Sequence, residues 1–295
     1  MRHFTKQSPL FLAFTAQSGT QTATETNNNT MQNYYKTIGA LAAASALVAG
    51  NASAQDTQAG YSQPGQMTAV NNSFGSSFEG EVHVGYSTEY IFRGLNLGDD
   101  LIESGVDVSA EMAGFGLSAG AWYGTTQFDE QFGGVAEGQT YDELDLYAEV
   151  SKDFGFVTAA VGYIYYYYPS DLTGFQSTAE TYFSVSGSYM GFDTSLTYFW
   201  DTKGDNDGYM EAYVGKGFEL SPCLTLNTGV TLGYLWEEND FSHVAAKVSL
   251  DWAFTEHATL SPYIAHSWAL SDEVDGFYEG SENEFYGGLI LAVSF

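Results

Sequence analysis

The chain of 295 residues carries 37 Asp and Glu against 8 Lys and Arg, a formal net charge of −29. This balance excludes nucleic acid as a partner, because contacts to phosphates require Lys and Arg. One cysteine excludes a disulfide framework and a cysteine-rich metal site. A hydrophobic share of 44%, with 22 Tyr and 21 Phe, opposes a disordered chain despite the charge.

The first part of the chain has the features of an export signal. Residues 31–54 begin with a short basic region, continue with an apolar stretch and end in Ala52-Ser53-Ala54, an A-x-A cleavage site. We therefore predict a secretory signal peptide at 31–54, a mis-assigned or disordered extension at 1–30, and a flexible polar leader at 55–77. The mature chain would hold 36 acids and 5 bases, a net charge of −31. After residue 54 no apolar run reaches the roughly 18 residues of a membrane-spanning helix.

From residue 78 onward, apolar and polar residues alternate with a period of two, which is the pattern of β-strands. Residues 143–150, for example, read Glu-Leu-Asp-Leu-Tyr-Ala-Glu-Val, and no helix-like return at three and four residues occurs. The pattern predicts twelve strands, at 79–93, 100–113, 115–127, 141–152, 155–168, 178–190, 192–201, 208–219, 223–236, 241–254, 258–270 and 284–295.

The connectors between these strands fall into two classes. Tight turns are predicted at 113–116, 153–155, 190–193, 221–223 and 255–257. The alternate connectors, at 128–140, 169–177, 202–207, 237–240 and 271–283, are longer or more acidic, and 94–99 is intermediate. Short turns on one rim and longer loops on the other are typical of an all-β, antiparallel, up-and-down transmembrane barrel, with short periplasmic turns and longer extracellular loops.

A soluble β-sandwich also has alternating strands, but three features favour a membrane barrel over residues 78–295. The strands are long enough for a tilted span. Aromatic residues gather towards strand ends, as interfacial girdles require; they include Tyr90, Phe92, Tyr165 to Tyr168, Phe199, Trp200, Tyr234, Trp236, Trp252 and Phe254. The last strand is apolar at alternate positions and stops at Phe295. Pro262 lies inside a predicted strand, where we expect a bulge because proline cannot donate to the ladder.

If the apolar faces contact lipid, the opposite faces line the lumen. The predicted lumenal acids are Glu81, Glu89, Glu103, Asp107, Glu111, Glu143, Asp145, Glu149, Glu180, Glu211 and Asp251, against the bases Arg93 and Lys247. Twelve strands lie between the filled eight-stranded barrels and the open sixteen-stranded channels. We expect a narrow, acid-lined passage that favours cations, or a polar plugged core in which the acids only keep the interior wet.

Arg93 is the most distinctive residue of this predicted lumen. It ends the first strand, and the 94–99 connector is expected to bring Glu103 within reach, with Glu89 further along the same strand. Charge-assisted pairs there would shape the mouth. We therefore hypothesise that Arg93 helps to set the constriction, against the alternative of a solvated rim charge.

Catalytic and metal sites are weakly indicated. A lipid-hydrolysing barrel needs a Ser-His pair, and the candidates are Ser242-His243 and His266-Ser267. Neighbours in a strand face opposite ways, so neither pair is expected to hydrogen-bond. Acids near 201–207, 237–240 and 272–275 match no metal-binding pattern and read as hydrophilic turns, with loose Ca²⁺ or Mg²⁺ binding left open. We predict no enzyme, no cofactor and no structural metal.

Three elements resemble a known family. Tyr90-Ile91-Phe92-Arg93-Gly94, Glu143-Leu144-Asp145-Leu146-Tyr147 and the Tyr165–Pro169 run, in this order, are similar to the TorF-type porin family of Gram-negative bacteria, over residues 78–295. The resemblance implies an outer-membrane β-barrel with a porin role and brings no catalytic residues.

The sequence therefore predicts an outer-membrane channel for passive diffusion of small solutes or cations. Its expected partners are outer-membrane lipid and the barrel-assembly machinery, which would recognise the last strand ending in Phe295. The alternatives are a non-conducting structural or surface-interaction barrel and, less favoured, a lipid-modifying enzyme. Substrate and oligomeric state stay open.

Overall fold

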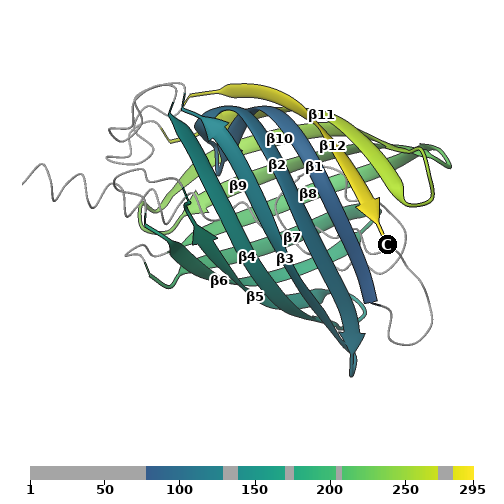
Figure 1. Ribbon diagram of the computed structural model, residues 1–295. Helices are drawn as coiled ribbons and strands as arrows, with labels where there is room; N and C mark the ends of the chain where they lie inside the picture. Colours follow the sequence, from purple (N-terminus) through teal and green to yellow (C-terminus); the bar gives the residue numbers. More distant parts are fainter. Residues whose placement is uncertain (1–77, 129–138, 170–175, 204–207, 272–281) are drawn as a thin grey trace, which may run out of the picture.

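The computed structural model describes residues 78–128, 139–169, 176–203, 208–271 and 282–295, which form one closed barrel of twelve antiparallel strands (Figure 1). The predicted segments 1–30, 31–54 and 55–77 lie outside the described residues. The strands are β1 (Phe78–Phe92), β2 (Leu95–Met112), β3 (Phe115–Gln127), β4 (Thr140–Asp153), β5 (Thr158–Tyr167), β6 (Thr178–Tyr189), β7 (Phe192–Asp201), β8 (Tyr209–Ser221), β9 (Leu224–Leu235), β10 (Asp240–Ala253), β11 (Ala258–Ala269) and β12 (Glu284–Ser294).

Each strand pairs with its neighbours in sequence, and the last strand closes the barrel on the first. The β1–β12 ladder runs from Glu81 opposite Ser294 to Ser87 opposite Gly288. Beyond it, the backbone N–H of Phe295 donates to Gly80 O at 2.9 Å, and Gly80 N–H donates to Phe295 O at 3.1 Å. The all-β, antiparallel, up-and-down barrel that the alternation predicts is thus confirmed.

Alternation places apolar side chains outside the barrel. Val82 and Val84 of β1, Leu146 of β4, and Leu289 and Val293 of β12 are all exposed. Their immediate neighbours along the strands are less exposed: Asp145 and Tyr147, on either side of Leu146, are buried, and those of the valines and Leu289 are half-buried. A closed sheet with an apolar outer face satisfies its backbone groups internally and offers lipid-compatible surface. No helix of the described residues is long and apolar enough to cross a membrane.

The first hairpin differs from the sequence-based expectation. β2 begins at Leu95 and not near residue 100, and Arg93 and Gly94 alone form the turn, with φ of 48° and 87°. Positive φ at both central residues is the type I′ geometry that matches the twist of a two-stranded ribbon. The predicted connector 94–99 is therefore wrong: most of it belongs to β2. Every other strand end lies within three residues of its predicted position.

The bulge expected at Pro262 is also absent from the β11–β12 ladder. Pro262 lies opposite Leu289, and the register is unbroken from Ala258 to Ser267. On its other side, the β10–β11 ladder has no pair at Pro262, between Ser249–Tyr263 and Trp252–Leu260, so the proline interrupts that ladder without a shift of register. Register shifts occur instead elsewhere, for example between Glu89 and Ile91 and between Phe241 and Val244. Both alter which side chains face inward.

Candidate functional site: the barrel interior

The inner face of the barrel is acidic and largely sequestered from solvent. Of the thirteen residues predicted to line the lumen, ten are buried, namely Arg93, Glu103, Asp107, Glu143, Asp145, Glu149, Glu180, Glu211, Lys247 and Asp251. Glu81 and Glu89 are half-buried and Glu111 is exposed. The buried acids need hydrogen-bond partners to remain inside, because an isolated carboxylate is costly to desolvate.

Aromatic residues supply many of these partners, in a repeated three-strand arrangement. Asp107 of β2, Gly120 of β3 and Tyr147 of β4 lie opposite one another across the sheet, and the Tyr147 hydroxyl donates to Asp107 Oδ1 at 2.5 Å. Two strands further on, Tyr182 of β6 donates across Gly162 of β5 to Glu149 of β4, at 2.8 Å. The glycine leaves room for the ring to cross the middle strand.

A second group of aromatics surrounds Glu143 and Glu103. Glu143 Oε2 accepts hydrogen bonds from the hydroxyls of Tyr90, at 2.9 Å, and Tyr141, at 3.0 Å. Glu103 Oε2 accepts from Trp122 Nε1 at 2.8 Å. The rings also contact each other, with centroids of Tyr90 and Trp122 5.8 Å apart. This part of the interior is therefore a packed aromatic and carboxylate cluster.

The bases of the inner face lie over aromatic rings. Lys247 Nζ lies 3.8 Å from the centroid of Tyr263. The Arg93 guanidinium carbon lies 4.0 Å from the centroid of Tyr209 and 5.1 Å from that of Phe199. Such cation–π contacts stabilise desolvated cations, which supports the burial of both bases.

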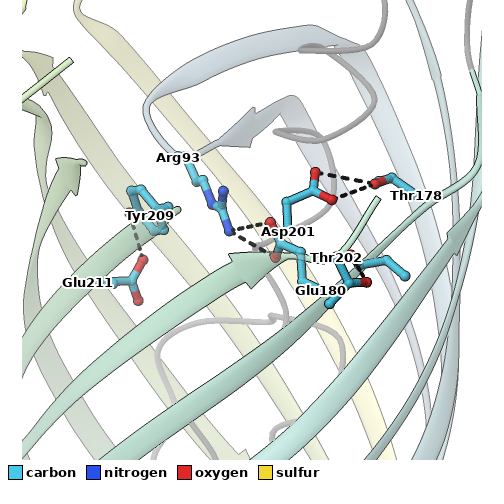
Figure 2. Close-up of polar contacts among 8 residues, drawn as sticks. Arg93, Thr178, Glu180, Asp201, Thr202, Tyr209 and Glu211 are labelled. Carbon is cyan, nitrogen blue, oxygen red and sulfur yellow. Dashed lines mark hydrogen bonds and ion pairs between the residues drawn. The ribbon is translucent and has the colours of Figure 1, made fainter. Parts of the chain in front are cut away.

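Arg93 reaches a different acid from the one expected. Its Nη2 contacts both carboxylate oxygens of Glu180, at 3.1 and 3.2 Å, as Figure 2 shows. Glu103 instead lies opposite Gly85 on β1 and bonds Trp122, and Glu89 lies opposite Asp99. Contrary to the prediction, Arg93 does not lie next to Glu103. Strands β1 and β2 stay paired well beyond Glu103, and the turn between them carries Arg93 into the barrel.

The aromatic residues near strand ends divide between the two faces. Trp200, Trp236 and Trp252 are exposed, as a girdle requires. Tyr90, Phe92, Tyr166, Tyr168 and Phe199, by contrast, are buried. The sequence carries a signal for this division, because Tyr147 lies on the same face of its strand as Glu143 and Glu149. A lumen predicted from acids and bases alone omits such tyrosines, which donate hydrogen bonds to the acids.

The candidate catalytic pairs behave differently from each other. His266 packs on Trp268, with ring centroids 4.4 Å apart, while Ser267 is fully buried on the other face, as expected. Ser242 Oγ, however, lies 3.0 Å from His243 Nδ1, and both residues are buried. The expectation that neighbours point apart is wrong here because the register shift between Phe241 and Val244 turns both side chains inward.

The part of the chain that the structure describes has no cluster of three His, Cys, Asp or Glu suited to a metal ion. Asp201 accepts from Thr178 Oγ1 at 3.3 Å and from Lys203 N at 2.7 Å. The other acids considered for loose cation binding at 205–207 and 272–275 lie outside the described residues.

Solved structures of similar shape are outer-membrane barrels. An outer-membrane channel from Pseudomonas putida F1 matches with a TM-score of 0.50 and 12% identity, over 77% of this chain and all of that one. The KdgM porin matches with a TM-score of 0.44 and 12% identity, over 73% of this chain and 99% of its own. Outer membrane phospholipase A from Escherichia coli gives 0.43 and 10%, over 77% and 94%. At these identities the likeness concerns the fold.

No functionally curated protein shows significant sequence similarity to the chain. One family model matches residues 71–284, which include eleven whole strands and the start of the twelfth, and its description is "Bacterial protein of unknown function". The chain belongs to this family of bacterial proteins, Gcw_chp.

Proposed function

We propose that the protein is a porin-like channel of the bacterial outer membrane, for passive diffusion of small solutes, with a preference for cations. The observation that carries this proposal is the contrast between the two faces of one closed barrel: apolar outside, and acidic inside. A ring of carboxylates favours cations and disfavours anions. The resemblance of the sequence to TorF-type porins also supports a channel function.

The proposed pore-lining residues contribute unequally to this preference. Glu111 is exposed, and Glu81 and Glu89 are half-buried, so their charges act on ions in water. Among the buried acids, Glu103 and Glu143 already bind aromatic donors, whereas Glu180 binds Arg93. The preference for cations is therefore expected to come mainly from the three acids that water reaches.

The direct test is reconstitution of the purified barrel into planar bilayers. In a KCl gradient, we expect discrete conductance steps and a reversal potential of the sign for K⁺ passing more readily than Cl⁻. A reversal potential of the opposite sign would contradict the cation preference but would still support the channel function. Absence of conductance would contradict the channel and favour a structural or surface-interaction barrel.

Lipid hydrolysis is the second candidate, because Ser242 and His243 form a hydrogen-bonded pair. Both side chains are buried, with 1% and 2% of their surface exposed, and they face the interior and not the lipid. A nucleophile acting on phospholipid must be reachable from the membrane. We therefore expect no phospholipase activity from the purified protein; activity that disappears in Ser242→Ala would establish the enzyme instead.

A further inference from the structure

The tip of the β1–β2 hairpin lies inside the barrel and not on its rim. Phe92 is fully buried, and Leu95 and Leu97 have 5% and 3% of their surface exposed. Hairpin tips of a barrel ordinarily face water. Figure 2 shows the corresponding ribbon curling into the space enclosed by the other strands. Three apolar residues at a tip are therefore hidden by the barrel's own interior.

The tip spans the barrel from one wall to the opposite wall. Arg93 belongs to the β1–β2 turn, and Glu180 to β6, which is five strands away in one direction and seven in the other. The Arg93–Glu180 ion pair, at 3.1 Å, therefore crosses the enclosed space. Tyr209, at the first residue of β8, lies under the same guanidinium.

A third wall segment contacts the tip at the glycine of the turn. A Cβ added to Gly94 would lie 2.6 Å from Cβ of His243, on β10, so backbone and imidazole are already in close contact. The tip thus meets β6, β8 and β10. These contacts lie near the ends of those strands that bear the longer connectors.

The turn also has a backbone conformation that its sequence does not favour. Arg93 has φ of 48°, in the left-handed region where Gly, Asn and Asp are the usual residues. An arginine there costs conformational energy, and the surroundings must hold it in place. Its contacts with Glu180, Tyr209 and Phe199 provide that restraint.

We propose that residues 90–98 form an internal constriction of the channel, latched to the far wall by the Arg93–Glu180 pair. This inference rests on the proposed channel function. The segment sets the size limit for permeating solutes, and Arg93 is its positioning residue. Release of the latch allows the tip to leave the interior and widens the passage.

The principal experiment shortens the hairpin. Glu89 and Asp99 lie opposite each other, so residues 90–98 can be replaced by Asn-Gly, which forms a two-residue turn between them. The barrel wall on the side of the tight turns is retained. In planar bilayers we expect the single-channel conductance of this variant to exceed that of the full chain severalfold.

The outcomes separate the constriction from the channel. A larger conductance in the shortened variant supports the constriction, including the case in which the full chain conducts little. Equal conductance in both proteins would overturn the proposed constriction, while the proposed channel function would still stand. Absence of conductance in both, with the barrels shown to be folded by circular dichroism and heat-shifted gel migration, overturns both.

A second experiment follows the tip itself and does not depend on conductance. In a Cys223→Ser background, Leu97→Cys places a thiol at a buried position of the tip. Its labelling by a polar maleimide should be slow, and should accelerate severalfold when Arg93→Ala is added. Lys152→Ala is the matched control, because Lys152 lies at the opposite rim, where it bonds Gly114 O.

Exchange of the two charges tests the latch. Arg93→Glu alone should accelerate labelling at position 97, and the double variant Arg93→Glu with Glu180→Arg should restore part of the protection. Fast labelling in the parent protein, or equal labelling in all variants, would overturn the latch.

Discussion

The hydroxyl of Tyr182 on β6 donates to Glu149 on β4, across the intervening strand β5. The ring reaches this far because Gly162, directly between the two residues in the ladder, has no side chain. Tyr147, Gly120 and Asp107 repeat the arrangement on β4, β3 and β2. These two carboxylates thus accept hydrogen bonds from tyrosines that lie two strands away.

The glycine of this arrangement gives a first prediction. In Gly120→Ala, the new Cβ would lie 2.5 Å from Asp107 Oδ1 and would also overlap the Tyr147 ring. Overpacking of this kind costs about 1–3 kcal/mol. We expect the free energy of unfolding in lipid vesicles, measured by urea titration, to fall by that amount. In a Tyr147→Ala background the same substitution should cost clearly less, since the ring is gone; an equal cost would show that the ring contact is not responsible.

The hydroxyl of Tyr182 gives a second prediction. Tyr182→Phe keeps the ring and removes the donor to Glu149, so a buried carboxylate oxygen loses its partner. An unsatisfied buried group costs about 1–3 kcal/mol. We expect a loss of that size in the free energy of unfolding. Combined with Glu149→Met, the substitution should be almost without further cost, because no carboxylate is left to satisfy. Additive losses in the double variant would exclude direct coupling.

The strands could be predicted closely from the sequence because both faces of each strand impose the same period. Residues 143–150 alternate acid or Tyr with apolar residues, and this requires no knowledge of neighbouring strands. The number of strands and their direction then follow from the positions of the turns. Closure could be predicted because an open sheet with an apolar outer face leaves unpaired edges.

The contacts inside the barrel could not be predicted in this way. The Arg93–Glu180 pair joins residues 87 positions apart on opposite walls, and its existence depends on the inward curl of one hairpin. Ser242 and His243 face the same way because of a one-residue register shift that has no local signature in the sequence. Alternation assigns a side chain to a face, whereas the partner on that face depends on three-dimensional closure.

Ion selectivity gives a third prediction, at the inner-face acid that water reaches most freely. Glu111 is exposed near the tight-turn end of β2. One charge acts on an ion at about 10 Å in water with about 0.4 kcal/mol, which is about a factor of two in relative permeability. We expect Glu111→Gln to lower the K⁺/Cl⁻ permeability ratio by about this factor, and the effect to shrink at high salt.

The matched control for this experiment is Glu256→Gln. Glu256 is also exposed, but it lies in the tight turn between β10 and β11 and not on a strand face. Its loss should leave the ratio unchanged. If both variants shift the ratio equally, net charge and not position would explain the effect, and the proposed role of the inner face would fail.

The last prediction concerns the closing strand. Phe295 exchanges two backbone hydrogen bonds with Gly80, and its ring lies where a side chain on Gly80 would be, so it covers the seam between β12 and β1. Its side chain is nevertheless 66% exposed and remains available to a partner. We propose that the barrel-assembly machinery reads this terminal residue. Phe295→Ala should lower the yield of folded barrel in cells while refolding of the purified chain in detergent proceeds nearly as in the parent.

Phe254→Ala, at an exposed aromatic after β10, serves as the control for loss of an aromatic ring. Equal yields in cells for the parent and Phe295→Ala would refute recognition of this residue, and an equal loss in cells and in detergent would assign it to seam packing alone.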